Sequence, residues 1–114
     1  MFIKGEFTTL NPYNKANRGN KYGGAQVMKD NKAVAYYQML NQPKIETPCK
    51  IKFTWHVKNA KTDPDNVGFC KKYILDAMVQ ANVIPDDTFK HIKGFIDEFV
   101  ISNQTGVKVE RVEE

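Results

Sequence analysis

Five side chains in the second half of the chain have the types and spacing that metal-assisted chemistry requires. Asp63, Asp65 and Asn66 form one short run, and Asp86 and Asp87 form a second. Neighbouring carboxylates repel one another, and Mg²⁺ or Mn²⁺ would remove that repulsion because hard cations prefer oxygen ligands. The residue before a proline favours an extended backbone, so we expect Asp63 to be extended and to share a side with Asp65. We also expect Asp65 to cap the helix that follows.

A calcium-binding EF-hand loop is excluded as an explanation of the first run. Asp63, Asp65 and Gly68 match the first, third and sixth positions of such a loop. Val67 and Ile74 occupy positions that need oxygen ligands, so the loop could not close around Ca²⁺.

A polar stripe is predicted on the helix expected at residues 63–80. Lys72 lies about 20° around the axis from Asp65, and Asp76 lies about 20° to the other side. Lys71 instead falls among apolar residues. Because the helix is otherwise apolar nearly all round, it should be central to the fold, where charge is costly unless it lines a cleft. Caps, turns and surface ion pairs are the alternative explanation of these charges.

The elements that must position these residues can be predicted from periodicity and turn residues. Residues 49–57 alternate apolar and polar side chains, with Trp55 on the apolar side, which predicts a strand with one face on the core. The predicted order is a strand at 1–9, a loop at 11–24, a helix at 25–40, a strand at 49–57, a helix at 63–80, and a terminal hairpin of strands at 95–102 and 107–112. This order, β-α-β-α-β-β, predicts a single α/β (α+β) domain over residues 1–114, with a mixed sheet of about four strands packed with two main helices.

Basic residues outside the acidic runs suit contacts with the phosphates of a nucleic acid. The net charge is +4 and the isoelectric point is about 9.0, which is compatible with a polyanionic partner. The candidate DNA-binding residues are Lys15, Arg18, Lys21, Lys58 and Lys61. A solvated surface explains the same residues without a ligand.

Other classes of protein are disfavoured by composition. No apolar run approaches the roughly 20 residues of a membrane span, and the first residues lack a secretory signal, so we expect a cytoplasmic protein. Cys49 and Cys70 form neither a CxxC pair nor a disulfide framework, and His56 and His91 stand alone. A structural zinc site is therefore not expected.

A family resemblance rests on four spaced segments between residues 60 and 90. They are Asp63-Pro64-Asp65-Asn66, then Lys72, then Leu75-Asp76-Ala77-Met78, and finally Asn82-Val83-Ile84-Pro85-Asp86-Asp87. In type and order they resemble the signature of the RusA family of Holliday-junction resolvases. One departure is an insertion of about three residues, nearly one helical turn, between Asn66 and the segment containing Asp76.

The resemblance implies a Mg²⁺-dependent homodimeric endonuclease, often encoded by a phage or prophage, that nicks two opposed strands of a four-way DNA junction. It implies metal binding by Asp63, Asp65 and Asp87, with Lys72 as the catalytic lysine. It implies supporting roles for Asn66, Asp86 and Asp76. The polar stripe also favours Lys72 over Lys71.

Two rival interpretations remain at this point. A non-catalytic basic DNA-binding protein would bind with strong salt dependence and would need no metal. A structural protein would use the acids only as caps and turn residues, so that Asp63→Asn and Asp87→Asn would change stability by about 1 kcal/mol and nothing else.

Overall fold

The structure is a computed structural model that describes residues 1–20 and 22–113. The elements in chain order are β1 (Phe2–Lys4), α1 (Leu10–Gly19), α2 (Gly23–Met39), β2 (Cys49–Val57), α3 (Pro64–Gly68), α4 (Lys71–Gln80), β3 (Ile92–Ile101) and β4 (Gly106–Val112). The predicted mixed α/β class and the four-stranded mixed sheet are confirmed. No helix among the described residues is both long and apolar enough to cross a membrane.

The strand order in the sheet is β1-β4-β2-β3, with β2 in the interior. β2 runs parallel to β3, with Val57 level with Ile101, and antiparallel to β4. The predicted terminal hairpin is therefore wrong, because β3 and β4 lie on opposite sides of β2. The connection between them crosses the end of β2, where the Ser102 amide donates to the Val57 carbonyl at 2.8 Å.

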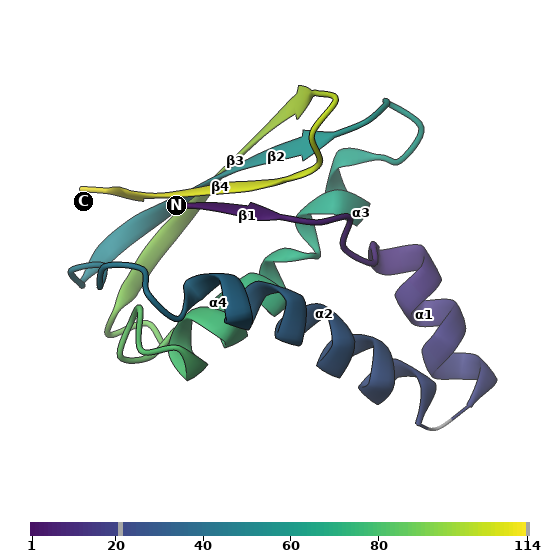
Figure 1. Cartoon of the computed structure of the whole chain (residues 1–114), viewed down its shortest axis with the longest axis horizontal. Helices are drawn as coiled ribbons and strands as arrows, with labels where there is room; N and C mark the ends of the chain where they lie inside the picture. Colours follow the sequence, from purple (N-terminus) through teal and green to yellow (C-terminus); the bar gives the residue numbers. More distant parts are fainter. Residues whose placement is uncertain (21, 114) are drawn as a thin grey trace.

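All the helices lie on one side of the sheet, which gives a two-layer domain (Figure 1). The core lies between the layers and combines one face of β2 with α4 and the inner side of α2. Strand β2 has the boundaries and the alternation that the sequence predicts, and Trp55 is only 2% exposed. Its other face carries Lys50 and Lys52 on the side of the sheet without helices.

The first expected loop is instead a helix, so that prediction is wrong. α1 occupies Leu10–Gly19 despite its asparagines and Pro12. Proline is tolerated there because the first-turn amides have no partner inside a helix. The Tyr13 ring packs 5.1 Å from that of Phe69, and this contact gives the helix a tertiary support that the sequence does not reveal. The initial strand is also shorter than predicted and covers only Phe2–Lys4.

The second predicted helix is interrupted between α3 and α4. At the junction the Cys70 amide donates to the Val67 carbonyl and the Lys72 amide to the Phe69 carbonyl, a tighter i to i−3 pattern. Asp65 therefore belongs to a separate short helix from Lys72. The predicted continuous stripe from Asp65 to Lys72 is therefore wrong, because the helix is interrupted between them.

Candidate functional site

Asp63 and Asp65 lie at the beginning of α3, which follows the loop leaving β2 (Figure 1). Asp63 has the extended backbone predicted for a residue before proline, with φ −66° and ψ 150°. Asp63, and not Asp65, occupies the N-cap position, so the capping prediction is wrong. Asp65 lies in the first helical turn, and the two residues do not share an extended segment. Both residues are exposed, and within the described chain neither forms an ion pair.

Exposed basic residues occur on two segments next to this short helix. α1, which carries the exposed Lys15 and Arg18, contacts α3. Lys61 is exposed in the loop just before Asp63. Lys58 is less available, because its ammonium forms an ion pair with Glu6 at 3.0 Å. The predicted contact at Lys21 lies outside the described residues.

The segment that leads into α1 is held against the beginning of α4 through the carbonyl of Thr8. The Tyr73 hydroxyl donates to this oxygen at 2.7 Å, and the Cys70 thiol donates to it at 3.5 Å. Burial raises the pKa of the Cys70 thiol to about 12. Burial, followed by the proximity of Cys70 and Tyr13, also raises the pKa of Tyr73. Both groups therefore remain protonated donors at neutral pH, and they join the segment before α1 to α4.

The two neighbouring lysines of α4 have different surroundings. Lys72 has a side chain 57% exposed, and its ammonium lies 3.5 Å from Asp76, which Lys32 of α2 also approaches at 3.9 Å. Lys71 is largely enclosed, and its ammonium lies 2.6 Å from Asp97 and 4.8 Å from the centre of the Phe95 ring. Of these two lysines, Lys72 is thus the more accessible to an external phosphate. The Lys72–Asp76 part of the predicted stripe is present.

Asp87 is separated from Asp63 and Asp65 by the length of the sheet. It lies in the connection that enters the N-terminal end of β3, whereas α3 lies beyond the C-terminal end of the parallel strand β2 (Figure 1). A nine-residue strand spans about 30 Å. The Asp86 carboxylate accepts the Asp87 amide at 2.8 Å and so positions this residue.

The three predicted metal ligands are therefore not assembled within one chain. No group of three His, Cys, Asp or Glu side chains in residues 1–20 and 22–113 is placed to hold a metal ion. Asp63 and Asp65 supply the oxygen ligands that Mg²⁺ prefers. Together with Asp87, however, they do not form a cation-binding site within one chain. Asn66 is partly exposed in α3 beside the two acids.

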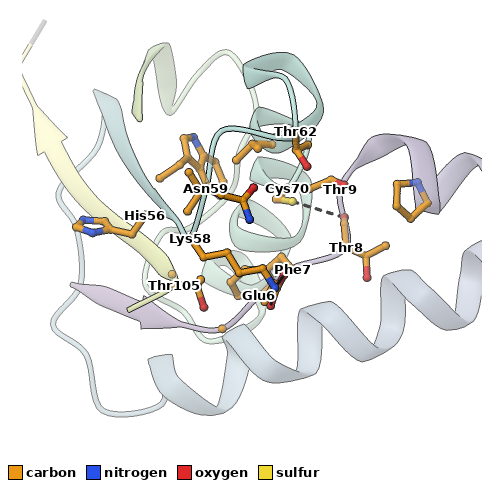
Figure 2. A pocket seen from close by; sticks show the side chains of 16 residues that line it. Glu6, Phe7, Thr8, Thr9, His56, Lys58, Asn59, Thr62, Cys70 and Thr105 are labelled. Carbon is orange, nitrogen blue, oxygen red and sulfur yellow. Dashed lines mark hydrogen bonds and ion pairs between the residues drawn. The ribbon is translucent and has the colours of Figure 1, made fainter. Parts of the chain in front are cut away.

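A cavity of about 410 Å³ lies next to the loop that leads to Asp63 (Figure 2). Its walls come from the segment after β1, the end of β2 and the helix junction at Cys70, and Figure 2 shows the Cys70–Thr8 contact inside it. Its polar lining includes His56, Asn59 and Thr62. The proposed metal ligands do not line this cavity, so it is separate from the carboxylates.

The interaction of Asp97 with Trp55 and Lys71 is a feature that sequence reasoning missed. The indole Nε1 of Trp55 donates to one carboxylate oxygen of Asp97 at 2.9 Å, while Lys71 contacts the other. Only the parallel pairing of β2 with β3 brings these residues together, and the sequence carries no local signal of that pairing.

Comparison of the chain with models of protein families, with curated proteins and with solved structures found no match.

Proposed function

We propose that this protein is a Mg²⁺-dependent endonuclease that resolves four-way DNA junctions by paired nicks, acting as a homodimer in recombination or repair. The observation that carries the proposal is the pair of exposed carboxylates at α3, which form no ion pair within residues 1–20 and 22–113, on a chain that also exposes basic residues on the neighbouring α1 and the preceding loop. The spaced residues that resemble the RusA signature include this pair.

The arrangement has features that a pure DNA-binding protein would not need. Exposed carboxylates beside a basic surface repel phosphate, so a binder gains nothing from them. A nuclease needs both, because the basic residues attract the DNA backbone while the carboxylates hold a cation. A bound divalent cation would supply an activated water and neutralise charge on the scissile phosphate.

The chain's own residues have distinct roles in this proposal. Lys15, Arg18 and Lys61 bind the DNA backbone. Lys72 contacts the scissile phosphate and stabilises the charge that builds up there. Asp76 holds Lys72 within reach through their contact at 3.5 Å, and Asp86 positions the backbone at Asp87.

Incubation of a labelled synthetic four-way junction with and without Mg²⁺ tests the proposal. Wild type should nick the junction only with metal, and Asp65→Asn should bind the junction without cutting it. Asp30→Asn is the matched control, since Asp30 is an exposed aspartate on α2, and it should cut like wild type. If these proteins bind the junction tightly and none of them nicks it, the proposal is wrong and the rival interpretation, a non-catalytic DNA-binding protein, is favoured.

A further inference from the structure

The cavity of about 410 Å³ in Figure 2 has apolar walls and a fixed shape. Phe7, Val57 and Val67 are among the residues that line it. The Cys70 thiol donates to the Thr8 carbonyl at 3.5 Å, and this contact holds the segment after β1 against the helices. The volume lies within the range of pockets that enclose a small ligand, roughly 300–1,000 Å³. The cavity is therefore formed before any ligand binds, and it has room for one heterocyclic ring system.

The charges that line this cavity neutralise each other. Glu6 and Lys58 both line it, and their side chains form an ion pair at 3.0 Å. Among its described lining residues no other Asp, Glu, Lys or Arg occurs. A phosphate or carboxylate inside the cavity would lose its water without gaining a free counter-charge, whereas a neutral ligand would not incur that cost. The lining therefore favours a ligand part that carries no charge.

Uncharged hydrogen-bonding groups from two loops line the same cavity (Figure 2). Asn59 and Thr62 come from the loop after β2, and Thr105 comes from the connection between β3 and β4. The Asn59 side-chain oxygen accepts the Lys61 amide at 3.0 Å, which leaves the NH₂ group of Asn59 as a donor. The hydroxyls of Thr62 and Thr105 have no hydrogen-bond partner within the described part of the chain. Apolar walls with a few neutral donors and acceptors suit a planar heterocycle such as a nucleobase.

The cavity lies on the connection that leads to the first acidic run. Thr62, which lines it, directly precedes Asp63 in the chain. A nucleotide whose base enters the cavity keeps its sugar and phosphate at the mouth, close to this connection. The side chains of Lys58 and Glu6 are 61% and 64% exposed, so a phosphate at the mouth can compete with Glu6 for the Lys58 ammonium.

We propose that this cavity binds one unpaired base of the DNA, turned out of the base stack beside the phosphodiester that is nicked. The inference rests on the proposed function, which supplies the DNA. Turning a base out costs least where pairing or stacking is already disturbed, as at the crossing point of a four-way junction. Contact with the apolar walls and hydrogen bonds to Asn59 and Thr62 offset this cost. The bound base then determines which phosphodiester lies next to Asp63 and Asp65.

Junctions that carry the fluorescent base 2-aminopurine at successive positions test the proposal without divalent metal. Emission of this base rises when it leaves the stack, so wild type should raise it at one position beside the crossing point. Thr105→Phe should still bind the junction but give no rise, because the ring fills the cavity. Thr54→Phe is the matched control on the face of β2 without helices, and it should behave like wild type. No rise at any position with bound wild type, or an equal rise with Thr105→Phe, would overturn the proposal.

Titration of the wild-type protein with free deoxynucleosides, followed by NMR, needs neither DNA nor a cavity-filling variant. The amide signals of Asn59, Thr62 and Thr105 should shift saturably at millimolar concentrations, because one base supplies little binding energy, and deoxyribose alone should not shift them. Asn59→Ala should weaken binding about fivefold through loss of one hydrogen bond. Asn41→Ala, an exposed asparagine after α2, should bind like wild type. Absence of these shifts, or equal binding by Asn59→Ala, would overturn the proposal.

The two measurements separate failure of the base site from failure of the proposed function. A wild type that binds deoxynucleosides in the cavity and turns out the junction base, but makes no nicks with Mg²⁺, would remove the proposed function and leave the base site intact. A wild type that nicks junctions with Mg²⁺, but shows neither the rise in emission nor the amide shifts, would remove the base site and leave the nuclease intact.

Discussion

The ammonium of Lys71 lies 2.6 Å from the carboxylate of Asp97, and this ion pair ties α4 to β3. The same carboxylate accepts the indole N–H of Trp55 at 2.9 Å. Asp97 thus receives two donors from two different elements, and it anchors the helical layer to the edge strand β3.

Replacement of Asp97 by Asn should lower the free energy of unfolding by about 1–2 kcal/mol, because charge-assisted hydrogen bonds in partly enclosed sites are stronger than neutral ones. Emission from Trp55, the only tryptophan, should report the transition during chemical denaturation. The matched control is Glu98→Gln, whose pair with Lys52 is more exposed, and it should cost about 0.5 kcal/mol or less. Equal costs for the two variants would contradict a special role for Asp97.

Substitution of the two adjacent lysines of α4 should have different effects on catalysis and on stability. Lys72→Ala should reduce junction cleavage by about 10²-fold, because it removes a stabilising charge, while stability changes by less than about 0.5 kcal/mol. Lys71→Ala should instead destabilise the fold by about 1–2 kcal/mol through loss of its contacts with Asp97. Cleavage rates and denaturation curves of both variants give the comparison. A larger catalytic loss in Lys71→Ala, measured on folded protein, would reverse the assignment.

Basic residues of α1 should set the salt dependence of junction binding. Lys15→Ala and Arg18→Ala should each reduce the slope of log affinity against log salt by about 0.9. Lys44→Ala, an exposed lysine in the α2–β2 connection, should leave the slope unchanged. Fluorescence anisotropy over a range of salt concentrations measures these slopes. Equal slopes for all the proteins would place the DNA on another surface.

Alkaline pH should destabilise the protein through Cys70. The thiol loses its proton near pH 9.0 in the unfolded chain but only near pH 12 in the folded protein. Between these values the folded state binds one more proton, so the free energy of unfolding should fall by about 1.4 kcal/mol per pH unit. Below pH 9 this group should contribute no pH dependence. Cys70→Ala should have a shallower decline above pH 9, measured by denaturation at several pH values, and an unchanged slope would contradict this origin.

Local patterns in the sequence predicted the elements whose own residues decide their structure. β2 follows from its strict alternation, and the body of α2 follows from helical spacing ended before Pro43. α1 was missed because its support comes from tertiary contacts, namely its packing against α2 and the contact of Tyr13 with Phe69, which is far away in the sequence.

The pairing of strands was the harder part to predict. Nothing local in β3 shows that it pairs parallel to β2 and not with β4, since the short connection is equally suited to a hairpin. The geometry of the candidate site could not be predicted for the same reason. Asp63 and Asp87 have side chains of a type that can bind a metal ion, but the distance between them depends on the strand topology. Residue types and spacing predicted the carboxylates, whereas their relative positions depend on strand pairing that the sequence does not encode locally.

Cleavage of a supercoiled plasmid that extrudes a four-way junction tests the central claim most directly. Paired nicks across the junction, made within the lifetime of one complex, convert the circle to a linear molecule, whereas single nicks give a relaxed circle. We expect linear product that requires Mg²⁺ and is lost in Asp65→Asn. Wild-type protein that binds the plasmid junction but yields no nicked or linear product with Mg²⁺ would contradict it.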